Sequence, residues 1–221
     1  MIRTADDVNR MANLLAMKIE QRRPDIREHT DYVRGKRGTL KFASDEFKRY
    51  MSDRFSGFAD NWCLPVAQAP VERIHFRGFI PYGDVELDSH VMRVWERNDC
   101  DRKLQETALM MTTTGRAFGL VTSMPDGRAR ISFEHPDSAA VHYDPLTGEV
   151  DAGLLVRYDE EHEFGTLLLP DVVFDVVRVR GGGDDERDRL PPGVEGWMFL
   201  PESARPNPLG RVPLVEFRNQ M

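Results

Sequence analysis

The chain has few cysteines, no excess of positive charge and no long apolar run, and each shortage excludes a class of protein. Cys63 and Cys100 are too few for a disulfide framework and do not form a CxxC pair, so a reducing compartment is expected. The longest apolar runs, such as LLLP and ALMM, fall far below the ~20 residues of a membrane span. The start, MIRTADDVNR, has no apolar segment of the kind found in signal peptides. These features predict a soluble intracellular protein.

The balance of charge limits the partners that the protein can bind. The 221 residues include 37 acidic and 30 basic side chains, a net charge of -7, whereas a chain that grips nucleic acid through its phosphates usually has an excess of Lys and Arg. Hydrophobic residues at 40% and charged residues at 30% are ordinary for a folded globular protein. The densest basic cluster consists of Arg34, Lys36, Arg37 and Lys41. We interpret it as a solvated loop, with a small DNA-binding accessory protein as an alternative.

The first half of the chain has the periodicity of helices. Thr4 and Asp7 resemble a capping pair, and apolar residues then recur at helical spacing as far as Ile19. Pro24 is expected to end or restart this helix. The elements expected next are a loop at 34–38, a short helix between Ser44 and Gly57, a kinked helix over 62–73, a strand at 74–79, and helices around 91–95 and 104–111, the last capped by Gly115.

After Gly115 the pattern changes to short strands separated by turn residues. Strands are expected at 117–122, 130–133, 140–143, 154–158, 165–169, 172–179, around 197–200 and at 212–217, and a solvated loop at 181–194. Hairpin-length connections predict a mainly antiparallel meandering sheet. The fold class is therefore α+β, with N-terminal helices first and the sheet second. The expected division is a helical segment, 1–57, and an α+β core, 58–221.

Cys63 is the first candidate for chemistry. A nucleophilic thiol needs a base within hydrogen-bond reach and a feature that lowers its pKa, and the local sequence NWCLP supplies neither. We expect Cys63 to be a buried, inert thiol that packs beside Trp62. A thiol-dependent hydrolase that uses Cys63 and a histidine is the alternative from a different class.

The other candidates are ligands for metals and phosphates. Acidic residues and histidines gather at Glu134, His135, Asp137, His142 and Asp144, but their spacing matches no zinc signature. We expect His135 and Asp137 to cap a turn beside Pro136, and His142 to be the solvent-side residue of a strand. The run GGGDDE cannot cradle phosphate, because carboxylates follow the glycines. The sequence therefore predicts no metal, no cofactor and no enzyme.

Several segments stand in an order typical of one family. Two are specific: ADNWCLPV at 59–66, which leads to ERI at 72–74 and GF at 78–79, and NPLGRVPLVEF at 207–217. The weaker ones are LKFAS at 40–44, Phe47, RF at 54–55, Trp95, Ala108, GRAF at 115–118, EHP at 134–136, YDP at 143–145 and LLPD at 168–171. Together the segments resemble the portal (head–tail connector) proteins of tailed double-stranded-DNA phages, in their siphophage-type branch.

The resemblance implies a structural subunit. Portal proteins form a homo-oligomeric ring, typically dodecameric, at one vertex of the capsid. A terminase motor pumps double-stranded DNA in through the ring, and the DNA later leaves through it. The partners implied are other portal subunits, terminase, capsid and head-completion proteins, with no membrane, in the virion and in the host cytoplasm during assembly. A net acidic channel protein suits DNA that must pass without being held.

The resemblance also assigns structural roles to nine motif residues, which are Asn61, Trp62, Pro65, Arg73, Gly78, Phe79, Asn207, Pro208 and Gly210. Trp62 and Phe79 are expected to be core anchors, and Arg73 to be partly buried and paired. The NPLG turn is expected to direct the chain towards the stem of the family. Because family members continue into a stem, clip, tunnel loop and crown, the chain resembles the N-terminal, wing-forming half: a fragment, a truncated prophage remnant or an incomplete gene.

Overall fold

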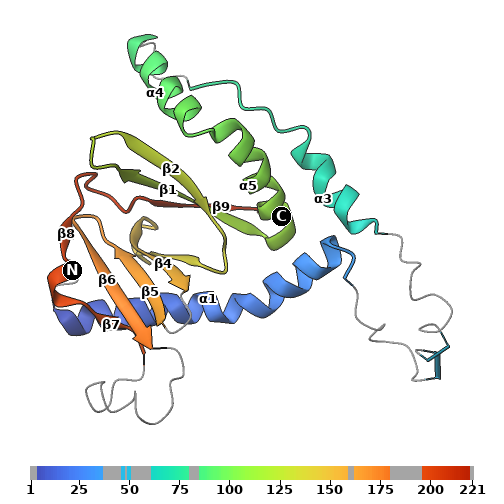
Figure 1. The fold of residues 1–221 in the computed structure, drawn as a ribbon, viewed down its shortest axis with the longest axis horizontal. Coiled ribbons are helices and arrows are strands. Elements are labelled where there is room, and N and C mark those ends of the chain that lie inside the picture. The colour runs from blue at the N-terminus through green and yellow to red at the C-terminus, as the bar shows by residue number, and fades with distance from the viewer. Residues whose placement is uncertain are drawn as a thin grey trace. The chain divides into compact units, whose positions relative to one another are not determined.

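The computed structural model describes residues 4–36, 46–47, 49–50, 61–79, 85–158, 162–179 and 196–219. Its helices are α1 (Ala5–Val33), α3 (Cys63–Val71), α4 (Val85–Arg97) and α5 (Cys100–Thr114), with a 3-10 turn η1 (Pro201–Ser203). Its strands are β1 (Arg116–Ser123), β2 (Ala129–Glu134), β3 (Ala139–Tyr143), β4 (Val150–Tyr158), β5 (His162–Leu168), β6 (Val172–Val179), β7 (Met198–Phe199), β8 (Arg205–Pro206) and β9 (Leu214–Arg218). Helices come first and strands second, which confirms the α+β class (Figure 1).

The chain forms two compact units. The first contains residues 1–23 and 117–217, and the second contains residues 24–116 and 218–221. The first helix thus begins in the unit that contains the strands. The expected boundary after residue 57 lies outside the described residues, so it stays a prediction.

The start of α1 is capped as the sequence predicts. The Asp7 backbone N–H donates to the Thr4 hydroxyl at 3.2 Å, and the Thr4 N–H donates to the Asp7 carboxylate at 3.3 Å, a reciprocal capping box. The prediction that Pro24 ends or restarts this helix is wrong, because α1 continues to Val33. A proline inside a helix costs about 3 kcal/mol. The two residues before Pro24 contact distant backbone: Arg22 donates to the Ala139 carbonyl and Arg23 to the Asp137 carbonyl. Such tertiary contacts outweigh the low helix propensity of proline.

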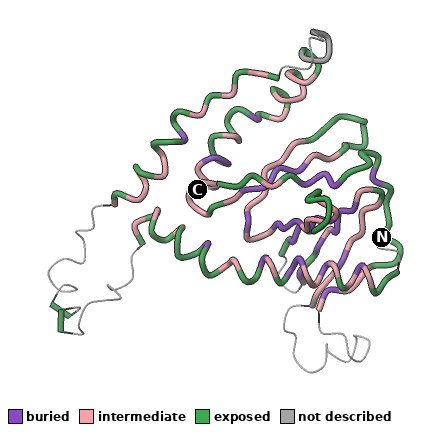
Figure 2. The backbone as a smooth tube through the Cα atoms, turned by 180° about the vertical axis from the view of Figure 1, so that it is seen from behind, coloured by how far each residue is buried: buried purple, intermediate pink, exposed green. Residues whose placement is uncertain are grey.

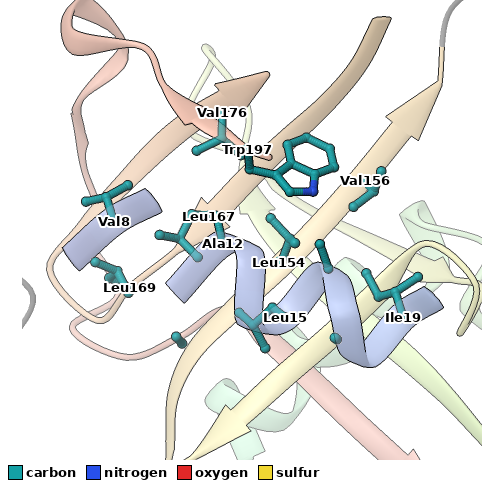
Figure 3. Close-up of a cluster of buried hydrophobic side chains, with 13 residues drawn as sticks. Val8, Ala12, Leu15, Ile19, Leu154, Val156, Leu167, Leu169, Val176 and Trp197 are labelled. Carbon is teal, nitrogen blue, oxygen red and sulfur yellow. The ribbon is translucent and has the colours of Figure 1, made fainter. Parts of the chain in front are cut away.

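Strands β3 to β7 form the predicted antiparallel meander. They lie in the order β3-β4-β5-β6-β7, and β8 also pairs with β6 in this six-stranded sheet. One face packs on α1, whose apolar stripe includes Leu15 and Ile19, both almost fully buried. Figure 3 shows these side chains in one cluster with Leu154 and Trp197. A Cβ at Gly165 would lie 2.7 Å from Val176 and 2.9 Å from Trp197, so only glycine leaves room for the indole.

Helix α1 also satisfies the free edge of β3. Arg23 donates to the Asp137 carbonyl at 3.3 Å, Arg22 to the Ala139 carbonyl at 3.0 Å, and Lys18 to the Val141 carbonyl at 3.5 Å. The three carbonyls are two residues apart and lie on one side of β3 and of the turn that precedes it, where Asp137 is found. These side chains therefore cover an edge that could otherwise pair with another chain.

Two asparagines of α1 bind backbone at the opposite edge of the sheet, at β7 and the residue before it. The Trp197 N–H donates to Asn13 Oδ1 at 3.0 Å, and the Phe199 N–H donates to Asn9 Oδ1 at 2.8 Å. At 1.5 Å per residue, the helix rises about 21 Å from Asn9 to Arg23. The four strand spacings of about 4.8 Å from β3 to β7 cover about 19 Å. The helix is thus long enough to reach both edges of the sheet.

A second, three-stranded sheet packs on the other face of the meander. Its order is β2-β1-β9, so the last strand joins the β1–β2 hairpin rather than the meander. Phe118 and Leu214 are buried there against Leu155 and Leu168. Successive residues of β4, Leu154 and Leu155, therefore point to opposite faces, and both are buried. The first unit has three layers: helix, six-stranded sheet and three-stranded sheet.

The second unit contains α3, α4 and α5. Gly115 caps α5 in the left-handed conformation (φ +83°), as predicted, and its N–H donates to the Met111 carbonyl at 2.9 Å. The predicted strand at 74–79 is wrong, since these residues have no regular structure. Gln105 instead donates to the Ile74 carbonyl at 2.8 Å. Figure 2 shows that α3 is exposed or intermediate along most of its length.

Two further predictions fall largely on undescribed residues. Of the short helix expected between Ser44 and Gly57, only residues 46, 47, 49 and 50 are described, and these are helical. The loop expected at 181–194 lies outside the described residues.

Candidate functional site

The nine motif residues are all described, and they form two groups. Asn207, Pro208 and Gly210 lie in the first unit, and the residues from Asn61 to Phe79 lie in the second. Each group is built around one asparagine, and the two asparagines have different surroundings.

Asn207 is buried, and its side-chain amide fixes the turn that follows β8. Its Nδ2 group donates to the Leu169 carbonyl at 2.8 Å and to the Arg211 carbonyl at 2.9 Å. Its Oδ1 atom accepts a hydrogen bond from the Leu209 N–H at 3.1 Å. Gly210 has φ +65°, a conformation that favours glycine. The three hydrogen bonds of the Asn207 amide therefore stabilise the turn. The expected role of the turn in directing the chain towards a stem stays a prediction.

Asn61 joins the end of α1 to the start of α3 within the second unit. Its Nδ2 group donates to the Val33 carbonyl at 2.7 Å, and its Oδ1 atom accepts from the Cys63 N–H at 3.2 Å. The amide therefore satisfies an orphan carbonyl of one helix and an orphan N–H of the other. Gly35 (φ +70°) lies against it, and a Cβ there would be 3.3 Å from Asn61 Nδ2. The hydrogen bond to Val33 and the contact with Gly35 therefore fix the conformation of the chain directly after α1.

The expectation of core anchors in this segment is wrong. Trp62 is 67% exposed and Phe79 is 36% exposed, while Arg73, expected to be partly buried, is exposed. The face of α3 that is turned inward contains Leu64, Ala67 and Val71. Trp62 precedes the first turn of the helix and is out of phase with that face, so its indole is turned outward.

Phe79 belongs instead to a surface aromatic cluster. Its ring centroid lies 4.9 Å from that of Phe76 and 5.6 Å from that of Trp95, and Phe76 stacks on Trp95 at 4.2 Å. The Trp95 indole N–H donates to Asp101 at 2.8 Å. The cluster therefore fastens the irregular segment 74–79 to α4 and α5. Gly78, with φ +136°, provides the backbone conformation between the two phenylalanines.

A comparison with protein families decides which family this architecture represents. The family model described as phage portal protein, SPP1 Gp6-like, matches residues 80–221, well over half of the chain. The chain belongs to this family of phage portal proteins. A comparison with curated proteins gives no match.

The portal-family match covers the NPLG turn and all of the described helices and strands after residue 84, but not the segment around Asn61. The family supports a structural role in the phage portal and in head–tail connection, at the capsid vertex of the virion. It also points to assembly with other phage head proteins. The role of the Asn61 group in that assembly stays a prediction.

The two cysteines of this portal-family chain have different environments. Cys63, the first residue of α3, was expected to be buried but is half-buried. It lies next to the exposed face of the helix. Cys100 is fully buried, and burial raises the pKa of its thiol, which disfavours the reactive thiolate. His75, the nearest histidine in sequence to Cys63, is exposed. The hydrolase alternative therefore gains no support from this geometry.

The residues considered as metal ligands form turns and hydrogen bonds. His135 lies 2.6 Å from Asp137, and its hydrogen bond holds the pKa of that carboxyl below its usual range. His142 lies 2.7 Å from Asp151, and Glu134 accepts from the Ser132 hydroxyl at 2.8 Å. Among the described residues, no three His, Cys, Asp or Glu are placed to hold a metal ion. In the described part of the chain, no helix is long and apolar enough to cross a membrane.

Sequence reasoning missed one buried charged group in the portal-family core. Glu163 is 3% exposed and accepts from Arg178 Nε at 2.6 Å, while Arg178 Nη2 donates to Glu20 at 2.7 Å. Burial acts to lower the pKa of Arg178, but the bonds to the two glutamates outweigh it and raise the pKa. Glu163 and Arg178 are direct cross-strand partners, a relation that appears only once the register of β5 and β6 is known.

Proposed function

We propose that the chain is a structural subunit of a homo-oligomeric portal ring through which double-stranded DNA is packaged and ejected, and that it supplies the wing region of that ring. The observation that carries the proposal is the family match over residues 80–221. The ring is expected to be dodecameric. Its partners are a terminase, capsid proteins and head-completion proteins, met in the host cytoplasm during assembly.

The electrostatics support a part that lets DNA pass. The net charge is -7, and each neutralised phosphate would strengthen retention of DNA. In the first unit, Lys18, Arg22 and Arg23 donate to backbone carbonyls of β3 and of the turn before it. Arg178 is likewise engaged by two carboxylates. These contacts use N–H donors of the four cations within the fold, and the two carboxylates also offset the charge of Arg178, so fewer groups remain to hold phosphate.

The first test is the mass of the purified chain across a range of concentrations. Native mass spectrometry and light scattering are expected to show an oligomer, and electron microscopy a ring with a central channel. A chain that stays monomeric at high protein concentration contradicts the ring.

The second test is retention of DNA. Fluorescence anisotropy with a labelled random-sequence duplex is expected to show only weak binding, which disappears as salt rises. Tight binding that persists at physiological salt contradicts a DNA-passing part and favours the DNA-binding alternative.

A further inference from the structure

Helix α3 carries a continuous apolar stripe on its exposed side. The residues concerned are spaced i, i+3, i+4, i+7 and i+8, which places them on one face of a helix. All five are exposed: Trp62, Pro65, Val66, Ala69 and Pro70. Trp62 is 67% exposed and Val66 is 70% exposed. An apolar strip of this length, on the order of 400 Å² from the areas typical of such side chains, is the kind of patch that marks an interaction site.

The first unit contains an apolar groove of about 340 Å³. Its walls come from the two sheets and from the NPLG turn, and include Val121, Leu155, Leu168, Val173, Pro206 and Leu209. The hydrogen bonds of Asn207 hold the turn that forms one wall. Arg205 also lines the groove, and its side chain is 58% exposed although it is paired with Asp175 at 2.9 Å. A guanidinium in this position can stack on an aromatic ring that enters the groove.

We propose that the α3 stripe of one copy of this chain docks into the apolar groove of the next copy, with Trp62 inserted beside Arg205. The inference rests on the proposed ring. A ring of more than two subunits needs a heterologous interface, in which two different surfaces of each subunit complement each other. The stripe and the groove meet that requirement, because one is an aromatic ridge and the other an apolar hollow with a cation.

The area sets a limit on what the stripe can do. A stable interface buries roughly 800 Å² per partner, so the stripe supplies about half of one side. The aromatic anchor is then the centre of the contact, and surrounding surface completes it.

The position of the contact can be tested by cross-linking in the full chain. Trp62 is replaced by the photoreactive p-benzoyl-phenylalanine, and isotope-labelled and unlabelled copies are mixed before irradiation. Mass spectrometry is expected to find position 62 joined to residues 205–213 of a copy with the other label. Cross-links within one chain, or to other segments of the neighbour, overturn the proposal.

The energetic test uses one charge on each surface. Val66→Asp and Leu209→Asp are each expected to raise the concentration needed for assembly by about tenfold or more, as hot-spot changes do. Leu146→Asp is the matched control, because Leu146 is 94% exposed and lies outside both surfaces. The double variant Val66→Asp with Leu209→Lys is expected to recover assembly, which a folding defect would not do. Thermal melts of every variant check the fold.

The outcomes separate the docking from the ring. If the wild-type chain assembles and the two Asp variants assemble equally well, the docking fails and the ring stands. If the wild-type chain never assembles, the ring itself fails, and the docking fails with it.

Discussion

The two units differ in how much of their apolar surface they bury. In the first, α1 and two sheets cover one another, and side chains such as Phe118, Leu154 and Trp197 are almost completely buried. In the second, the described residues classed as buried are Ile26, Val71, Cys100, Thr107 and Ala108, while α3 exposes a whole apolar face. The first unit thus buries its apolar side chains within one chain. The second presents surface that suits contact with another molecule.

The largest expected effect is the loss of Trp197 from the first unit. Trp197→Ala is expected to lower the free energy of unfolding by about 3–5 kcal/mol, because a large aromatic leaves a cavity in a packed core. Trp62→Ala in the second unit is the matched control, and is expected to change stability by less than about 1 kcal/mol, since the indole is exposed. Urea unfolding followed by circular dichroism measures both.

Trp197→Phe sharpens this test. The indole N–H of Trp197 is buried with no hydrogen-bond partner among the described atoms, so phenylalanine removes an unsatisfied donor while keeping most of the packing. Trp197→Phe is expected to lower the free energy of unfolding much less than Trp197→Ala does. If Trp62→Ala and Trp197→Ala lower the free energy of unfolding equally, the two units do not differ in how far they bury their apolar side chains.

Asn207→Ala is expected to have the next largest effect, about 2–3 kcal/mol on the first unit. The substitution leaves the Leu169 and Arg211 carbonyls without their donor in a buried position. Asn207→Asp is the informative companion, because it keeps the acceptor for the Leu209 N–H but loses both donated bonds. We expect Asp to be no better tolerated than Ala in the same urea measurement. A well-tolerated Asp would show that the donated bonds contribute little.

Asn61→Ala is expected to cost about 1–2 kcal/mol in the second unit, because it removes a bond to each of two helix ends. Hydrogen exchange should rise at residues 33–36 and 63–66 and stay unchanged in β4 and β5. Asn61→Asp, which keeps only the bond from Cys63, is expected to fall between wild type and Ala. Faster exchange across the strands instead would mean that the two units unfold together.

The smallest expected effect is the pH dependence of the Asp137 turn. The hydrogen bond from His135 lowers the pKa of Asp137 in the folded state, so its stabilising contribution is present above the unfolded pKa of about 3.9. The contribution is lost as the pH falls through the folded-state pKa. Asp137→Asn should therefore be less stable than wild type at pH 7, and the difference should shrink in strong acid. A difference that is the same at both pH values would contradict this account.

Turn chemistry made much of the fold predictable. The strand predicted at 172–179 matches β6, the capping pair Thr4–Asp7 is formed, and Gly115 ends α5 as expected. Each of these features depends on residues within one turn of one another, so the local sequence contains the necessary information.

Burial in the second unit was not predictable in the same way. Helix α3 has apolar residues on both sides, so periodicity cannot tell whether Trp62 or Leu64 is turned inward. The strand expected at 74–79 has a suitable composition, but strand formation also needs a partner strand. For the candidate site, the asparagines of the motifs could be singled out from sequence, whereas the carbonyls that they bind could not. The Val33 and Leu169 carbonyls come from residues 28 and 38 positions away, and the Arg211 carbonyl alone is local to its asparagine.

The sequence by itself therefore determined the α+β class, most of the order of the elements and the family, because periodicity, turn residues and short motifs are local properties. It also identified Asn61 and Asn207 as residues of interest. The pairing of β9 with β1, the passage of α1 through Pro24 and the outward position of Trp62 depended on the tertiary structure. These features are set by contacts between distant segments, whose packing energy exceeds the local preferences that a sequence reveals.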